Sequence, residues 1–217
     1  MRSLKRLAAA LGLSLPPPST GERVAFLISG VGSPFMTPLY TASVLVGTVA
    51  RSLREFALWV SLVCVFFVGL GLGYVIMQVV RGKISDLHVS DASQRAGPFG
   101  VAVCGSLAGL IGLWWMAVPW PLVALGTSFV VQASCFGLLT RWSKISMHVA
   151  VAAACVTTLV WFFAWAAVPL IVLLPLQGWA RMRRGRHTLR QVVTGAVLAP
   201  VLTVLTLLPW WAAGFAR

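Results

Sequence analysis

Acidic side chains are scarce in this sequence. Glu22, Glu55, Asp86 and Asp91 are the four acids among 217 residues, and they face 17 lysines and arginines, which gives a formal net charge of +13. Charged residues of both signs make up 10% of the chain, whereas a soluble domain carries about 25%. With 59% hydrophobic residues, such a chain would expose a large apolar patch if it folded in water. The composition therefore excludes an ordinary soluble protein.

Long polar segments are also lacking. After a basic leader at residues 1–23, the longest polar stretch is 81–97, and the mean hydropathy of the chain is +0.92. A helix that crosses a bilayer needs about 20 apolar residues and satisfies its own backbone polar groups. We therefore expect an all-α fold, a polytopic transmembrane helix bundle of six to seven spans whose partner is the lipid bilayer. The leader is expected to form an amphipathic helix on the membrane surface, and residues 24–217 a single transmembrane domain.

The sequence has no closely spaced cysteine pair. Each of the four cysteines lies within an apolar run, and none belongs to a CxxC motif. Such cysteines are usually packed apolar side chains. The spacing therefore argues against a disulfide framework and against a cysteine metal site.

Prolines and short polar loops divide the apolar chain into its expected spans. Pro34 and Pro38 interrupt the run at 24–50, where we expect a broken or re-entrant start followed by a span at about 33–50. Pro169 divides the long run at 145–180 into two. The remaining spans are expected near 57–80, near 98–118, from the turn at Pro119 to about 139, and near 191–213.

Positive charge is distributed unevenly over the loops. With seven spans, the leader and the loops 81–97, 141–144 and 181–190 share one side and carry 14 basic residues, against three on the other side. The positive-inside rule assigns the richer side to the cytoplasm, as expected for a protein of a bacterial cytoplasmic membrane. Because the charges are divided among short loops, they suit anionic headgroups or a phosphorylated ligand, and no nucleic acid partner is expected.

The three histidines of the chain are expected on this same face. His88, His148 and His187 each lie at the edge of an apolar run, close to lysine or arginine. Arginine side chains and helix N-termini bind phosphate oxygens. One neutral imidazole can attack phosphorus, and a second can protonate the leaving oxygen. The pattern therefore favours phosphoryl transfer with no obligatory cofactor.

Three segments carry a resemblance to a known family. Lys-Ile-Ser-Met-His at 144–148 resembles the Pro-Ser-Gly-His motif of the type-2 phosphatidic acid phosphatase superfamily. Residues 180–191 resemble its third motif, which is Ser-Arg, five residues, His, three residues, Asp, and the following 192–195 match its Val-x-x-Gly continuation. The loop 83–98 is similar to a variant of the first motif, Lys, six residues, Arg-Pro.

The resemblance implies the fold of that superfamily and the activity of its membrane branch, a lipid phosphate or isoprenyl (di)phosphate phosphatase acting through a phosphohistidine. His187 would be the nucleophile, His148 the general acid, and Gln191 would take the place of the residue that orients the nucleophile. The substrate would be an amphiphilic phosphorylated lipid or prenyl compound. Its phosphate would be bound by basic and hydroxyl side chains of the three segments: Arg95, Arg181, Ser146, Lys83, His88 and Lys144.

Several positions depart from the family pattern. Gln191 stands where the family has Asp, so the histidine partner can accept a hydrogen bond but carries no charge. The corresponding carboxylate loss in a Ser-His-Asp triad lowers the rate by about 10⁴. The family lysine falls on His88, while Lys83 lies at a different spacing, and Ile145 and Met147 replace Pro and Gly.

The acids of the loop 81–97 leave a second function open. Asp86 and Asp91 either cap the loop and balance neighbouring cations, or bind Mg²⁺ and bridge it to a diphosphate. The second possibility predicts a Mg²⁺-dependent prenyl-diphosphate lyase or cyclase on the same scaffold, although the spacing forms no DDxxD motif. A transporter is disfavoured, because the expected spans carry essentially no charged residues.

Overall fold

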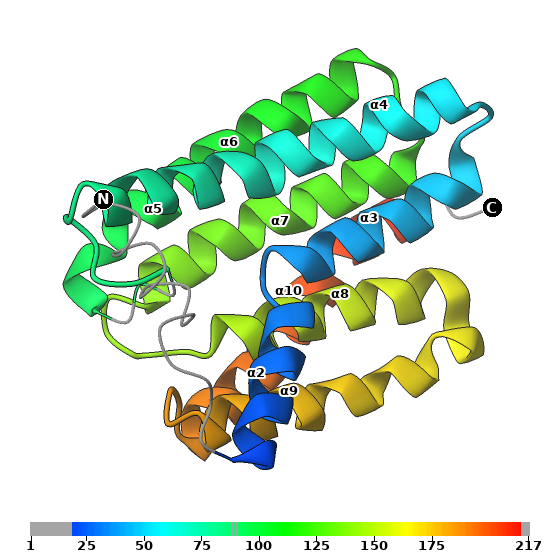
Figure 1. Cartoon of the computed structure of the whole chain (residues 1–217). Coiled ribbons are helices and arrows are strands. Elements are labelled where there is room, and N and C mark those ends of the chain that lie inside the picture. The colour runs from blue at the N-terminus through cyan, green and yellow to red at the C-terminus, as the bar shows by residue number, and fades with distance from the viewer. Residues whose placement is uncertain (1–18, 88, 90, 214–217) are drawn as a thin grey trace.

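The described part of the chain is entirely helical in its regular structure. The computed structural model describes residues 19–87, 89 and 91–213, and the regular elements of these residues are α-, π- and 3₁₀-helices (Figure 1). Five helical segments among them are long and apolar enough to cross a membrane: Leu53–Val80, Ala96–Trp115, Trp120–Leu139, Met147–Ala166 and Leu189–Ala212. The all-α prediction is confirmed, and the five apolar segments indicate an integral membrane protein.

The outer surface of these helices is apolar, as lipid contact requires. Ile111, Val197 and Leu205 have about three fifths of their side-chain surface exposed, although each lies in the middle of a long helix. In water this arrangement would leave a large apolar patch, whereas a bilayer covers it.

The chain begins with two short helices separated by a break. Ser19 caps α2 (Thr20–Val31) in a capping box with Glu22, so this helix starts inside the expected leader; residues 1–18 lie outside the described residues. The chain breaks at 32–35, which includes Pro34, and α3 (Met36–Val49) follows. The break expected between 24 and 50 is present, and it leaves two helices that are each shorter than a full span.

One long helical segment and two helices of 20 residues follow. α4 (Leu53–Val63), the π-helix η1 (Cys64–Gly69) and α5 (Leu70–Val80) form a continuous run. After the loop and the short η2 (Ala92–Gln94) come α6 (Ala96–Trp115) and α7 (Trp120–Leu139). The bounds of all three runs lie within four residues of those expected from hydropathy.

The last third of the chain contains the helices that carry the second and third motifs. α8 (Met147–Phe163) ends in the 3₁₀ turns η3 (Ala164–Ala166) and η4 (Val168–Val172), where Pro169 lies, and the chain returns as α9 (Leu173–Arg183). α10 (Leu189–Ala212) packs extensively against α8 and also contacts α7 and α9. The expected division of 145–180 is therefore present.

Three loops meet at one end of the bundle. α5, α7 and α9 end there, and α6, α8 and α10 begin there (Figure 1). The loops 81–95, 140–146 and 184–188 consequently share one end, as the alternation of the spans predicted. At the same end, α2 packs against α9, where the side-chain amide of Gln177 donates to the backbone carbonyl of Gly32.

Candidate active site

The start of α8 presents a buried hydroxyl that does not cap its helix. Ser146 is the N-cap residue, and its hydroxyl makes no capping hydrogen bond. An N-cap serine ordinarily accepts from a backbone amide of the first turn. Here the side chain is fully buried, and Oγ has no hydrogen-bond partner in the described part of the chain. A buried hydroxyl without a partner is unfavourable, and a bound oxyanion would remove that penalty.

His148 lies beside this serine on the first turn of α8. It is the second residue of the helix, and only 4% of its side-chain surface is exposed. A buried imidazole at a helix N-terminus lies where anions bind, because the free amides and the helix dipole favour negative charge. The second motif thus brings a hydroxyl and an imidazole to one buried helix start.

Arg181 contributes a buried guanidinium from the last turn of α9. Its side chain is 1% exposed, and among the described residues neither Nε nor Nη1 has a hydrogen-bond partner. The pKa of Arg181 is lowered to about 10, chiefly by burial and then by the charges of Arg184 and Arg186, while the charge of Asp86 opposes the shift. Taking a guanidinium out of water is costly unless an anion accepts its hydrogen bonds. The planar donor fork suits the oxygens of a phosphate.

The start of α10 orients His187. Thr188 caps the helix in a capping box with Gln191, whose Oε1 accepts from the Thr188 backbone amide at 3.2 Å. Because the Thr188 amide can only donate, the oxygen of the Gln191 side-chain amide must be the atom that faces the loop. Oε1 also lies 3.1 Å from Nδ1 of His187, and because this oxygen can only accept, Nδ1 carries the proton. The neutral ring therefore keeps its lone pair on Nε2.

Charges from three segments converge on this imidazole. The pKa of His187 is lowered to about 4, chiefly by burial and then by the charges of Arg181, Lys144 and Arg95; the hydrogen bond that its Nδ1–H donates to Gln191 opposes this shift. Expected phosphate ligands from the loops 81–95 and 140–146 and from the last turn of α9 thus act on one ring. At neutral pH the imidazole is uncharged, which is the form that acts as a nucleophile.

The acids of the first loop already have partners within the protein. Asp91 accepts from the backbone amide and the hydroxyl of Ser93 at 2.9 and 2.8 Å, and these bonds lower its pKa. Arg95 donates from Nε to the carbonyl of Val89 at 3.1 Å; burial lowers its pKa, and the charges of Asp91 and then Asp86 oppose that shift. Asp91 thus caps the loop, and Asp86 accepts from the hydroxyl of Ser85 at 3.3 Å and adds a weaker electrostatic contribution at Arg95 and Arg181.

Metal-ligand clusters of three or more His, Cys, Asp or Glu side chains are not found within residues 19–87, 89 and 91–213. Lys83 is exposed in the turn after α5, and it is not one of the cations that shift the pKa of His187. His88 lies outside the described residues. Of the expected phosphate ligands, Arg95, Lys144 and Arg181 therefore all act on His187. Ser146 is joined to α10, the helix that follows His187, because its backbone amide donates to the backbone carbonyl of Gln191.

One residue of the site was not anticipated from the sequence. Thr188 fixes the start of α10 and holds Gln191 in place, and the spacing Thr-x-x-Gln is itself a capping-box signal that could have identified it. Gly195, the glycine of the Val-x-x-Gly continuation, lies where a Cβ would come 3.0 Å from the carbonyl oxygen of Ser146. Only the packing of α10 against α8 reveals that close approach.

No protein-family model matches the chain, and no curated protein or solved structure matches it either. What can be inferred about function therefore comes from the residues and their arrangement. That arrangement is a neutral, oriented imidazole beside a buried guanidinium, a buried hydroxyl and a second imidazole.

Proposed function

We propose that the protein is an integral membrane phosphatase that hydrolyses a lipid phosphate or an isoprenyl phosphate or diphosphate through a phosphohistidine. One observation carries the proposal: Arg181 and Ser146 bury polar atoms that lack partners among the described residues. The charge of Arg181 acts on the neutral imidazole of His187, and the backbone of Ser146 is bonded to Gln191, which orients that imidazole. An oxyanion that accepts from both side chains offsets two burial penalties at once. The resemblance to the type-2 phosphatidic acid phosphatase superfamily points to the same chemistry.

The reaction proceeds in two displacements. Nε2 of His187 attacks phosphorus, a P–N bond forms, and the bond to the leaving oxygen breaks while His148 donates a proton to that oxygen. A water molecule then attacks the phosphohistidine, and His148 takes a proton from that water. The P–N bond breaks, and phosphate is released. Arg95, Arg181 and Lys144 balance the charge on the phosphoryl oxygens in both steps.

Gln191 gives this site a neutral positioning residue. Its carbonyl holds the proton of His187 on Nδ1, but it supplies no negative charge to stabilise the cationic ring that forms during transfer. We therefore expect His187 to keep its proton on Nδ1 but to attack phosphorus more slowly than it would beside a carboxylate.

The position of the site suits an amphiphilic substrate. The three loops lie at one end of the bundle, so a phosphate head can reach the basic residues while its apolar chain stays among the helices. By the positive-inside rule, this end of the bundle lies on the cytoplasmic side of a bacterial cytoplasmic membrane.

Phosphate release from a panel of phosphatidic acid, farnesyl, geranylgeranyl and undecaprenyl phosphates tests the proposal. The purified protein in detergent should release phosphate from at least one of them, and His187→Ala should abolish release. Leu189→Ala, an exposed position two residues further on, is the matched control and should keep the wild-type rate. Wild-type release by His187→Ala would refute the proposal.

A further inference from the structure

The chain turns sharply between the buried arginine of α9 and the candidate nucleophile. α9 ends at its C-cap residue Arg184, and Gly185 follows with a φ of +63°. The backbone amide of Gly185 donates to the carbonyl of Met182 at 2.9 Å, and the amide of Arg186 donates to the carbonyl of Arg181 at 3.1 Å. These two hydrogen bonds around a left-handed glycine form a Schellman motif, which ends a helix and reverses the chain.

The hydrogen bond between Arg186 and Arg181 joins the two functional parts of the third motif. Its acceptor is the main chain of Arg181, whose guanidinium is a proposed phosphate ligand, and its donor residue immediately precedes His187. The bond therefore closes the interval between the arginine and the histidine into one compact turn. The charge of Arg181 acts on the ring of His187, so the two side chains at the ends of this turn lie within electrostatic reach of each other.

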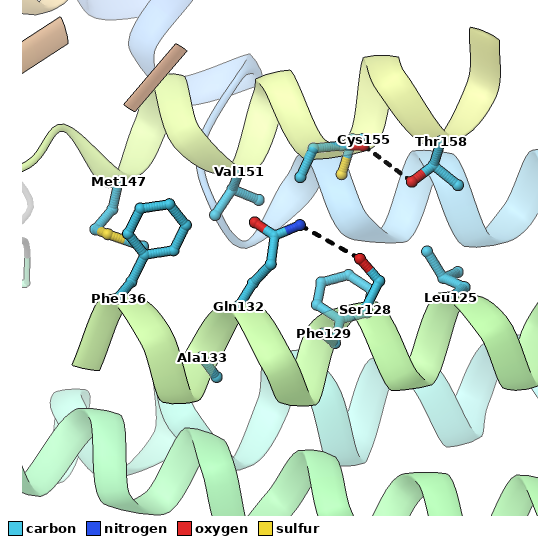
Figure 2. Close-up of a pocket in the computed structure, with 11 residues that line it drawn as sticks. Leu125, Ser128, Phe129, Gln132, Ala133, Phe136, Met147, Val151, Cys155 and Thr158 are labelled. Atoms are coloured by element: carbon cyan, nitrogen blue, oxygen red, sulfur yellow. Dashed lines mark hydrogen bonds between the residues drawn. The ribbon is translucent and has the colours of Figure 1, made fainter. Parts of the chain in front are cut away.

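The other helix start of the site is held by side-chain packing. Phe136 of α7 and Ile145 are buried in one apolar cluster, and Met147 of α8 packs against that cluster, as Figure 2 shows for Met147 and Phe136. Met147 lies between Ser146 and His148 in the sequence, so this packing fixes the hydroxyl and the second imidazole.

The turn at Gly185 depends on the main chain instead. Gly185 is exposed, and beyond its chain neighbours nothing in the described structure lies within 4 Å of the place where its Cβ would stand. A side chain there would meet no steric obstacle, and only the left-handed backbone would disfavour it. Glycine adopts this conformation freely, asparagine tolerates it, and β-branched residues avoid it. The effect of a substitution at Gly185 therefore reports the conformation of the turn.

We propose that Gly185 is a positioning residue for phosphoryl transfer, because its left-handed turn places the ring of His187 against the guanidinium of Arg181. This inference rests on the proposed phosphatase function. Attack requires the nucleophilic nitrogen to lie about 3–3.5 Å from phosphorus, and an error of about 1 Å costs about 10²-fold in rate. Since Arg181 binds the phosphate and the turn sets the position of His187 relative to Arg181, the turn determines whether the ring meets that requirement.

α5 supplies a matched control, because it ends in the same motif at the same end of the bundle. Gly82 is exposed and has a φ of +74°, and the amide of Lys83 donates to the carbonyl of Gln78 at 2.9 Å. None of these three residues is among the groups that act on His187. Breaking this turn should therefore cost about as much stability as breaking the turn at Gly185, without moving the nucleophile.

Three substitutions at Gly185 with graded tolerance of the left-handed turn test the proposal. Gly185→Asn should keep nearly the wild-type kcat/KM for phosphate release, Gly185→Val should lower it by at least about tenfold, and Gly185→Ala should fall between them. Gly82→Val and Gly185→Val should lower the unfolding temperature by similar amounts, about 2–8 °C, but Gly82→Val should keep the wild-type kcat/KM. If Gly185→Val does not fold, Gly185→Ala and Gly185→Asn make the same comparison. Equal losses of kcat/KM at the two glycines would overturn the proposal.

The pKa of His187 separates this proposal from the phosphatase proposal, because it is measured without turnover. Histidine-labelled protein in detergent is titrated by NMR, and His187→Ala identifies the signal. The groups that act on this ring come from four segments: Arg181, Lys144, Arg95 and Gln191. In Gly185→Val the ring should lose burial and the nearby Arg181 charge, so its pKa should rise toward its ordinary value, whereas in Gly82→Val it should stay at about 4.

The two proposals fail in different ways. If Gly185→Val keeps the wild-type pKa of His187 and the wild-type rate while His187→Ala is inactive, the positioning proposal is wrong and the phosphatase proposal stands. If the pKa rises as expected while His187→Ala still releases phosphate, Gly185 does position the ring, and the phosphatase proposal is wrong.

Discussion

The backbone amide of Ser146 donates to the backbone carbonyl of Gln191 at 3.2 Å, so the first residues of α8 and α10 are joined directly. Ser146 precedes His148 by two residues, and Gln191 orients His187. One main-chain hydrogen bond therefore sets the spacing between the two helix starts that carry the proposed acid and nucleophile. Gly195, one turn further along α10, permits the approach, because a Cβ there would lie 3.0 Å from the Ser146 carbonyl oxygen.

Gly195→Ala should lower both stability and activity. The new methyl group would meet backbone of α8 and a methyl group of Ala150 at 3.3 Å, so the helices must separate, and overpacking of this kind destabilises by about 1–3 kcal/mol. Thermal unfolding in detergent and phosphate release measure the two effects. Gly73→Ala is the matched control: nothing lies within 4 Å of a Cβ there, and alanine should stabilise α5 by up to about 1 kcal/mol. Equal behaviour of the two variants would contradict this packing explanation.

The sequence was sufficient to predict the helical bundle and the meeting of three loops at one end. Apolar runs of about 20 residues and the prolines at 34 and 169 determine where helices begin and break. The same prolines explain the span count: six to seven spans were expected, and five segments of the described chain are long enough. The break at 32–35 divides α2 from α3, and the turn at Ala167 limits the helical run of η4 and α9 to residues 168–183, so no helix in either region reaches the length of a bilayer.

Other features of the site depend on tertiary structure and could not be predicted. The resemblance of residues 180–191 to the third motif of the family implied that Gln191 stands where the partner of His187 is expected, and the two side chains are hydrogen-bonded. It could not predict how deeply Arg181 and Ser146 are buried, because burial depends on α8, α9 and α10 at once. An apolar cavity of about 70 Å³ between α7 and α8 (Figure 2) has no signal in the sequence, because it follows from how both helices pack on α10.

Replacing Gln191 by glutamate should introduce the missing charge. The carboxylate has the same length and can accept the same two hydrogen bonds, and an opposite charge at this distance should raise the pKa of His187 by about 1 to 3. We expect faster phosphate release at neutral pH and an acid limb of kcat/KM that moves to higher pH. Gln191→Leu removes the acceptor and should reduce release by at least about tenfold. Identical pH profiles for all three proteins would show that Gln191 does not act on His187.

The acid limb of kcat/KM should report the proton on His187. Since the unprotonated ring is the nucleophile and its pKa is lowered to about 4, activity should persist through pH 5 and fall only as the pH passes through about 4. Lys144→Met removes one cation that lowers the pKa of His187. The pKa should therefore rise, and the acid limb of kcat/KM of this variant should shift to higher pH. Arg190→Met removes an exposed cation that is not among the charges acting on His187, and its limb should stay in place. Equal shifts in both variants would indicate a general charge effect.

Chelation separates the phosphatase from the alternative Mg²⁺-dependent lyase or cyclase. Asp91 already accepts two hydrogen bonds from Ser93, and Asp86 acts electrostatically on Arg95 and Arg181, so we expect EDTA to leave phosphate release unchanged. Asp91→Asn should have little effect, and Asp86→Asn should alter substrate KM through the two arginines. Recovery of a lost rate by added Mg²⁺, together with a hydrocarbon product detected by gas chromatography, would support the lyase instead.

Trapping the phosphoenzyme is the most direct test of His187 as the nucleophile. An aryl phosphate has a leaving group that needs no protonation, so His148→Ala should still form the P–N bond but should hydrolyse it slowly, because the base that activates water is missing. Rapid quenching at alkaline pH followed by mass spectrometry should find an acid-labile phosphoryl group on the peptide that contains His187, and none in the His148→Ala, His187→Ala double variant. A phosphoryl group on another residue, or turnover in the double variant at the rate of His148→Ala, would contradict a phosphohistidine at His187.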